Sequence, residues 1–314
     1  MPRQNIGARS WAIYLYSISA IACLSFVATV PSQAAETYEG ALAEWSELKN
    51  GQPAACSPVV DSTEILHNTK TNIVFLVFHG FAGNPAQMTG LIDVLSAYDS
   101  NIIAPRIYGH FDQNMDDLDD VTFEQWLEQG RAALSVAQGL GDTVIVAGYS
   151  LGGLIATRLA LETPEQIDGL ILLAPAWRLT ARAVLESDIG ALLGIRSSPL
   201  GDTQICAPDA FDLSAPGAVE VHRLVQNTEV NFGLRAFARL EPAVALAIGD
   251  ADQIVASPFV QREIGRIQPD IPPIIIADAG HLFFIQSRDL YENSDVLGRR
   301  FIDSVQALVR DAAP

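Results

Sequence analysis

A five-residue turn, Gly148-Tyr149-Ser150-Leu151-Gly152, joins two apolar segments of different character. Residues 143–147 have the composition of a buried strand, and residues 153–160 have that of a helix. A serine in so sharp a strand-to-helix turn adopts strained backbone angles, and side chains two positions away on either side would collide. We therefore expect the Ser150 hydroxyl to be presented at the sheet edge, with the Leu151 amide directed at a developing oxyanion.

The glycine-x-serine-x-glycine motif alone is weak evidence because both residue types are common. Its interpretation depends on an amide-donating turn upstream, and on an acid and a histidine downstream in that order. Upstream, the unbroken apolar run 73–78 predicts a strand buried on both faces, and it ends in His79-Gly80-Phe81. We expect the Phe81 amide to be the second oxyanion donor and His79 to be structural. The alternative is an ordinary strand-to-loop turn.

Two carboxylates follow a later predicted strand. Residues 244–249 form an apolar run, and Asp250 and Asp252 come directly after it. Either aspartate stands where an acid that orients a catalytic histidine is required. The residue not used for that purpose is expected to be a solvated or turn-forming carboxylate.

The candidate general base is His281, one of five histidines in the chain. It follows the apolar run 273–277 and comes directly after Gly280, in the loop where a base after the acid is required. The other histidines are expected to be structural or surface residues: His67 in a polar lead-in, His79 and His110 in loops, and His222 in a probable helix.

These motifs together resemble the α/β-hydrolases of the carboxylesterase and monoacylglycerol-lipase branch, from about Ile73 to the C-terminus. In that family the orienting aspartate stands three residues after a glycine and three before a valine, which favours Asp252 over Asp250. The segment from Pro105 to His110 is also typical of the family. One departure is Phe111, which stands where these relatives usually have a further glycine.

The resemblance implies a serine hydrolase that needs no cofactor. His281 would take the proton of Ser150, Asp252 would orient the imidazole, and the amides of Phe81 and Leu151 would hold the oxyanion. The expected small-molecule substrate is a carboxylic ester with a short or medium acyl chain, monoacylglycerols among them. Alternatives are an acyltransferase, thioesterase or amidase with the same triad, or a non-catalytic hydrolase-like binding protein.

The N-terminus has the features of a secretory signal peptide. Residues 1–10 carry Arg3 and Arg9 but no acid, residues 11–30 are nearly uncharged, and small residues precede a cleavage position after Ala34. We expect residues 1–34 to be removed and the protein to be exported, to a periplasm or the medium. The alternative is an uncleaved anchor, the one case in which a membrane is a partner. The net charge of −18 argues against nucleic-acid binding through a basic patch.

Cysteines and acidic residues give no metal site. Signal cleavage would remove Cys23, and Cys56 and Cys206 would then form one disulfide or remain two free thiols. Neither has a histidine nearby at metal-ligand spacing. Residues 112–116 copy the first half of a calcium-loop motif, but the later glycine and glutamate are missing, so we interpret them as a solvated acidic loop. Oligomeric state is not predicted.

Residues 35–314 are expected to form a single catalytic domain of the α/β class. After a polar lead-in to Asn72, strands are predicted near 73–79, 101–104, 143–148, 168–174, 243–248 and 273–277, and helices near 86–98, 122–138, 152–163, 257–267 and 295–311. This alternation predicts an α/β-hydrolase fold, a mostly parallel sheet with helices on both faces. The interval 177–240 is too long for a simple crossover and is interpreted as a small, partly helical cap with an apolar lining. The alternative is a surface excursion without substrate contact.

Overall fold

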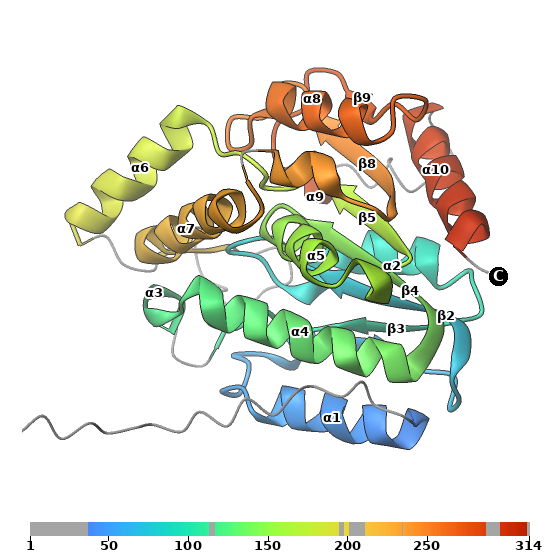
Figure 1. Ribbon diagram of the computed structural model, residues 1–314. Helices are drawn as coiled ribbons and strands as arrows, with labels where there is room; N and C mark the ends of the chain where they lie inside the picture. The colour runs from blue at the N-terminus through green and yellow to red at the C-terminus, as the bar shows by residue number, and fades with distance from the viewer. Residues whose placement is uncertain are drawn as a thin grey trace, which may run out of the picture. The chain divides into compact units, whose positions relative to one another are not determined.

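Seven strands form the main sheet of the computed structural model, which describes residues 37–112, 117–194, 198–200, 211–233, 235–286 and 296–312 (Figure 1). The strands are β1 Thr63–Ile65, β2 Thr71–Phe78, β3 Ser100–Ala104, β4 Gly141–Tyr149, β5 Gly169–Leu173, β8 Ala243–Gly249 and β9 Ile274–Ile276. Their order across the sheet is β1-β3-β2-β4-β5-β8-β9. Only β1 is antiparallel to its neighbour, so the predicted mostly parallel sheet is confirmed.

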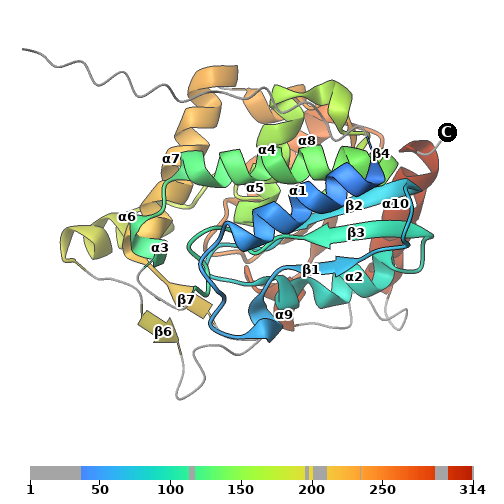
Figure 2. The same cartoon turned by 90° about the horizontal axis from the view of Figure 1, so that it is seen from below.

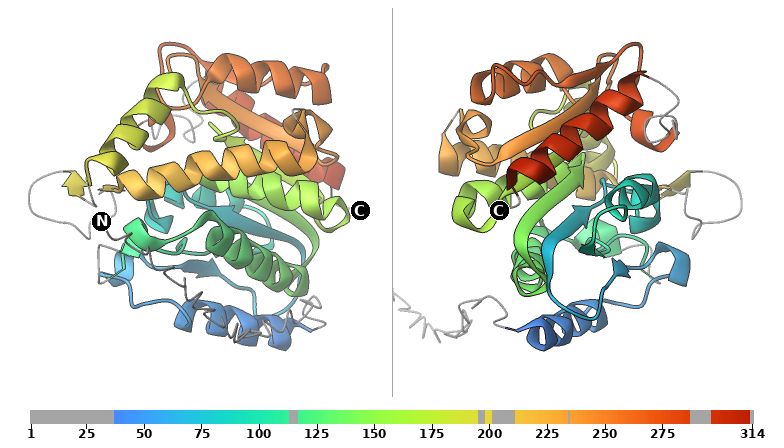
Figure 3. Two further views of the ribbon diagram at one scale, coloured as in Figure 1. Left: turned by 60° about the vertical axis from the view of Figure 1, so that its left-hand side comes forward. Right: turned by 90° about the vertical axis from the view of Figure 1, so that its right-hand side faces the viewer.

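The alternating side chains of the strands divide the core between the two faces of the sheet. On β4, Val144 and Val146 belong to one buried cluster, whereas Ile145, Ala147 and Tyr149 belong to the other. The first cluster lies under α4 (Phe123–Leu140) and α5 (Leu151–Glu162), and the second under α2 (Thr89–Leu95) and α10 (Val296–Ala312). Figure 3 shows α4 and α5 on the side of the strands opposite to α2. Helices on both faces are therefore confirmed.

The six predicted strands correspond to β2, β3, β4, β5, β8 and β9. Four predicted helices correspond to α4, α5, α8 (Ser257–Ile267) and α10, while the stretch near 86–98 is divided into a 3₁₀ turn at Pro85–Met88 and α2. The centre of each predicted strand is apolar, and the residues of β3 and β5 are all buried, as expected for strands covered on both sides. These runs fix which loops reach the carboxyl edge of the sheet, where the candidate site lies.

The interpretation of the region before Asn72 as a polar lead-in is wrong. It contains helix α1 (Tyr38–Asn50), a 3₁₀ turn (Pro58–Val60) and β1. The Thr37 hydroxyl caps α1 by accepting the Gly40 amide at 3.0 Å. Of the helix residues only Ala41 and Trp45 are buried, and α1 packs on α4. This buried stripe is too narrow to give a clear helical periodicity in the sequence.

The interval 177–240 is partly helical. It contains α6 (Ala181–Leu192), α7 (Ala215–Phe232) and a 3₁₀ turn (Ala236–Arg239), and α6 packs against α7. A separate two-stranded ladder pairs β6 (Ser198–Leu200) with β7 (Phe211–Leu213) (Figure 2). The remaining short helices are α3 (Asp117–Asp120), a 3₁₀ turn at Pro164–Gln166 and α9 (Phe283–Gln286). The function of the interval 177–240 as a cap over the substrate remains a prediction.

The predicted signal peptide, residues 1–34, lies outside the described residues, as do Cys23 and Cys206. Cys56 takes part in a disulfide bond. None of the helices in the described ranges is long and apolar enough to span a bilayer.

Candidate active site

Ser150 occupies the junction of β4 and α5 with backbone angles of φ 52° and ψ −112°. This left-handed conformation is rare for a residue with a side chain and costs about 1–3 kcal/mol. Both backbone groups of Ser150 are engaged: its amide donates to Leu173 O at 2.9 Å, and its carbonyl accepts from Leu154 and Ala176 at 3.0 Å. These hydrogen bonds hold the serine in its strained conformation.

The flanking glycines are required by close backbone packing. A Cβ atom on Gly148 would lie 2.3 Å from the Gly152 carbonyl, and one on Gly152 would lie 2.3 Å from Phe78 O. Both distances are far below van der Waals contact. The collision expected from the sequence is therefore present on both sides of Ser150.

A continuous hydrogen-bonded chain connects Ser150, His281 and Asp252. His281 Nε2 lies 2.9 Å from Ser150 Oγ, and His281 Nδ1 lies 2.7 Å from Asp252 Oδ2. A carboxylate only accepts hydrogen bonds, so His281 Nδ1 carries the proton and Nε2 is left as the acceptor facing the serine. The Asp252 side chain is fully buried, whereas 12% of the His281 side chain is exposed. The structure thus brings together three residues from three separate loops.

The two candidate acids have different contacts. Asp252 Oδ1 accepts the amides of Ile254 and Val255, both at 2.8 Å, so this carboxylate is oriented by its own loop while Oδ2 faces His281. Asp250 is exposed, and its Oδ1 accepts the Asp278 amide at 2.7 Å. The geometry therefore favours Asp252 as the partner of His281 and gives Asp250 a local part in the loop after β9.

The segment His79-Gly80-Phe81 lies directly against the serine. A Cβ atom on Gly80 would be 3.4 Å from Ser150 Cβ, so the chain just before Phe81 touches the elbow. Leu151 is the first residue of α5, and the first-turn amides of a helix lack partners within the helix. Among the described residues, no backbone acceptor is recorded for the Phe81 or Leu151 amide. Both amides therefore remain candidates for binding an oxyanion.

Four of the five histidines lie outside the hydrogen-bonded chain of Ser150, His281 and Asp252. His79 is buried: Nδ1 lies 2.8 Å from Gly80 O, and Nε2 accepts the Ile107 amide at 2.9 Å. His110 is buried edge-on to the rings of His79 and Phe81. Burial lowers the pKa of His79 well below 6.5 and that of His110 to about 4, so both are neutral at pH 7.

The two remaining histidines, His67 and His222, contact other residues. His67 Nδ1 lies 3.1 Å from Asp99 Oδ1, and His222 lies on α7 beside Gln226. Within the described ranges, no cluster of three or more histidine, cysteine, aspartate or glutamate side chains could hold a metal ion.

Tyr149 was not predicted as a site residue, because it stands at a variable position of the serine motif. Its hydroxyl donates to the main-chain oxygen of His281 at 2.8 Å, and its ring stacks on the imidazole with centroids 5.4 Å apart. The two residues are separated by 132 positions in the chain. No local sequence pattern could predict this contact.

Phe111, which replaces the glycine usual in the family, lies in the loop after β3. This residue has φ 53°, a left-handed angle that suits the glycine usual in the family, and its side chain is fully buried. Its carbonyl accepts the Cys56 amide at 2.9 Å. The next residue, Asp112, was expected in a solvated acidic loop, which is wrong: it is buried and paired with the guanidinium of buried Arg106.

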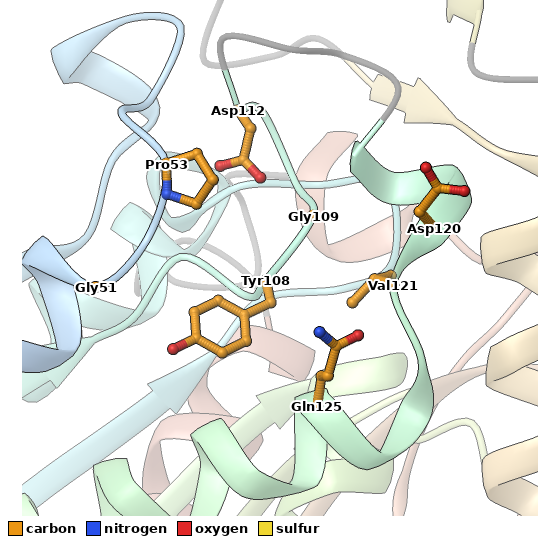
Figure 4. Close-up of a pocket in the computed structure, with 8 residues that line it drawn as sticks. All are labelled: Gly51, Pro53, Tyr108, Gly109, Asp112, Asp120, Val121 and Gln125. Carbon is orange, nitrogen blue, oxygen red and sulfur yellow. The ribbon is translucent and has the colours of Figure 1, made fainter. Parts of the chain in front are cut away.

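A cavity of about 400 Å³ lies beside this loop (Figure 4). The side chains of Asp112 and Gln125 point into it from opposite sides. None of Ser150, Asp252 and His281 lines it. The lining residues are Gly51, Pro53, Tyr108, Gly109, Asp112, Asp120, Val121 and Gln125.

The chain is similar in sequence to known esterases and lipases. A pimeloyl-(acyl-carrier protein) methyl ester esterase of Shewanella woodyi is 35% identical over 107 residues, 34% of this chain and 38% of that esterase. The chain therefore aligns with less than half of that relative's length. A thermostable monoacylglycerol lipase of Bacillus sp. is 28% identical over 209 residues, 63% of this chain and 78% of the lipase.

Solved structures have the same fold. A monoacylglycerol lipase of Paleococcus ferrophilus superposes with a TM-score of 0.57 at 17% identity, over 80% of this chain and 98% of the lipase. Residues 73–293 match the sequence model of one family over more than half of the chain. This segment contains the serine elbow, both aspartates and His281, and the predicted fold is confirmed. The chain belongs to the alpha/beta hydrolase family.

Proposed function

We propose that this chain is an exported serine hydrolase that cleaves carboxylic esters through an acyl-enzyme on Ser150. The observation that carries the proposal is the continuous chain from Ser150 Oγ through His281 to Asp252, with distances of 2.9 and 2.7 Å. Such a chain joins a nucleophile to its base and the base to an orienting group. It is found here at a strained serine beside two candidate oxyanion donors.

Acylation begins with the transfer of the Ser150 hydroxyl proton to His281 Nε2 as Oγ bonds to the ester carbonyl carbon. The carbonyl oxygen becomes an oxyanion, which the amides of Phe81 and Leu151 bind. Asp252 stabilises the imidazolium and holds the ring in its reactive tautomer. The bond to the alcohol oxygen then breaks, and the alcohol leaves with the proton from His281.

Deacylation repeats these steps with water. His281 takes a proton from a water molecule, whose oxygen attacks the acyl carbon of the ester on Ser150. The second tetrahedral intermediate collapses, the bond to Oγ breaks, and His281 returns the proton to the serine. The products are a carboxylic acid and free enzyme, and the residues are restored without a cofactor.

The substrate class and the location rest on separate observations. The named activities of the relatives, a methyl ester esterase and a monoacylglycerol lipase, support carboxylic esters as the substrate class. The apolar stretches 183–185 and 189–195 within the interval 177–240 support an acyl pocket under a cap, which predicts activity rising from acetyl to mid-length esters. The disulfide at Cys56 supports export, because disulfides persist in oxidising compartments.

The proposal is tested by hydrolysis of a chromogenic butyrate ester by residues 35–314 and by the same protein with Ser150→Ala. We expect the substitution to lower turnover by about 10⁴ to 10⁶-fold. Equal activity in the two proteins would remove Ser150 from the mechanism. A flat profile over acetyl, butyrate and octanoate esters would instead contradict the mid-length acyl pocket.

A further inference from the structure

We infer that Tyr149 is a positioning residue that holds His281 in reach of both Ser150 and Asp252. The inference deepens the proposed function and rests on it. Tyr149 is the last residue of β4 and directly precedes the serine, and only 2% of it is exposed. Its backbone is paired with Leu173 of β5, so the side chain projects from a rigid strand.

Tyr149 contacts His281 in two different ways. The hydroxyl donates to the His281 main-chain oxygen at 2.8 Å, which sets the position of the backbone. The ring lies against the imidazole with a centroid distance of 5.4 Å and an interplanar angle of 28°, which restricts its tilt. One side chain therefore constrains both the backbone and the ring of the candidate base.

The tyrosine ring is itself confined. Phe284 stacks on it at 5.4 Å and 29°. Gly80 also approaches it so closely that a Cβ atom there would lie 2.7 Å from Tyr149 Cδ1. Tyr149 therefore touches the segment before Phe81, adjoins the nucleophile and supports the base. Displacing this ring would disturb all three parts of the site together.

The hydroxyl is suited to act as a permanent donor. Burial, with a smaller contribution from the negative charge of Asp252, raises the pKa of Tyr149 far above its usual value. The phenol therefore stays protonated at neutral pH. Its proton is available to the His281 carbonyl throughout the catalytic cycle.

The loop that carries His281 has few regular supports. It follows the three-residue strand β9 and passes through Asp278, a non-glycine residue with φ 56°. The Asp278 amide is held by Asp250, and Ala279 O accepts the Ala251 amide at 3.1 Å. These contacts fix the loop before the histidine, and the Tyr149 hydroxyl extends the support to His281 itself.

The test compares Tyr149→Phe with wild type and with Tyr98→Phe. Tyr149→Phe keeps the ring stack but removes the donor. Tyr98 is a matched control because it packs on the same core cluster, against Phe75, outside the site. We expect Tyr149→Phe to lower kcat on a butyrate ester about tenfold with KM changed less than twofold. Tyr98→Phe should leave both constants unchanged.

A spectroscopic readout separates positioning from general loss of structure. The proton on His281 Nδ1, shared with Asp252, gives a downfield NMR resonance. Loss of this resonance in the Asp252→Asn variant would confirm that it belongs to the proton on His281 Nδ1. We expect this resonance to shift or broaden in Tyr149→Phe and to be unchanged in Tyr98→Phe. The inference is overturned by a folded Tyr149→Phe protein with wild-type kcat and resonance, or by equal losses in both tyrosine variants.

A failure of the proposed function is distinguishable from a failure of this inference. If wild type has no Ser150-dependent activity, the function is wrong, and the resonance still tests whether Tyr149 holds His281. Tyr149→Leu removes both ring and hydroxyl and should lower kcat further, about 100-fold. If that variant does not fold, Tyr149→Phe alone decides.

Discussion

At the scale of single residues, the site depends on which polar groups each side chain is free to contact. Asp252 has both oxygens committed, one to His281 and one to the amides of Ile254 and Val255. Asp250, two residues earlier, holds a loop amide instead. Asp250 and Asp252 are thus distinguished by their hydrogen-bond partners, although they are only two residues apart.

Replacing Asp252 with asparagine should lower kcat by about 10⁴-fold, because an amide group in place of the carboxylate permits the wrong tautomer of His281. Asp250→Asn is the matched control and should retain activity within a few-fold, since its acceptor oxygen is kept. Both are measured with the butyrate ester at pH 7. Equal losses in the two variants would contradict the assignment of Asp252.

His110 predicts a pH dependence of stability. Burial is the main cause that lowers its pKa to about 4, with a further contribution from Arg106, against 6.5 in the unfolded chain. Between these values the unfolded state binds more protons, so the free energy of unfolding falls as pH is lowered through this window. We expect His110 to contribute a loss of about 2 kcal/mol between pH 7 and pH 5.

Urea unfolding at the two pH values tests this contribution. His110→Asn should reduce the loss between pH 7 and pH 5 by about 2 kcal/mol, because asparagine does not titrate. The same pH dependence in wild type and His110→Asn would contradict the buried, neutral state of His110.

At the scale of elements, the chain entering the interval 177–240 is bound to the loop that carries the acid. The Thr180 amide donates to Ile254 O at 2.8 Å and its hydroxyl to Gln253 O at 2.7 Å, and the Ala256 amide donates to Arg178 O. Arg178 is also paired with Glu229 of α7. These hydrogen bonds therefore join the start of the predicted cap to the loop that carries Asp252.

Thr180 also caps α6, since its hydroxyl accepts the Ala183 amide at 3.2 Å. Thr180→Val keeps the shape but removes both hydrogen bonds of the hydroxyl, and it should lower the free energy of unfolding by about 1–2 kcal/mol. Thr180→Ser retains the hydroxyl and should stay within about 0.5 kcal/mol of wild type. Equal stability of the valine and serine variants in urea would show that neither bond contributes.

Elements differ in how far the sequence predicts them. The strands β2, β4 and β8 each contain an apolar run, and the order of these runs with the loop residues predicted the sheet and the grouping of Ser150, Asp252 and His281. Helix α1 was missed because it buries few side chains. Tyr149 was missed because its role depends on a contact with His281 that only the folded chain creates.

At the scale of the whole molecule, export remains a prediction that rests on the N-terminal segment of the sequence. A net charge of −18 gives a self-repelling surface. If export occurs as proposed, the protein produced from the full sequence in a secreting bacterial host should begin at Ala35. Intact mass spectrometry of the exported fraction measures this start. A mass equal to all 314 residues would indicate an uncleaved anchor instead.

The central claim is that Ser150 is the nucleophile activated by His281. The most direct test is peptide mass spectrometry after reaction of the purified protein with a fluorophosphonate, which labels activated serines. The account predicts one phosphonyl adduct, on Ser150, formed rapidly in wild type and lost or greatly slowed in folded His281→Ala. An unlabelled wild type, an adduct on another residue, or full labelling of Ser150 without His281 would contradict it.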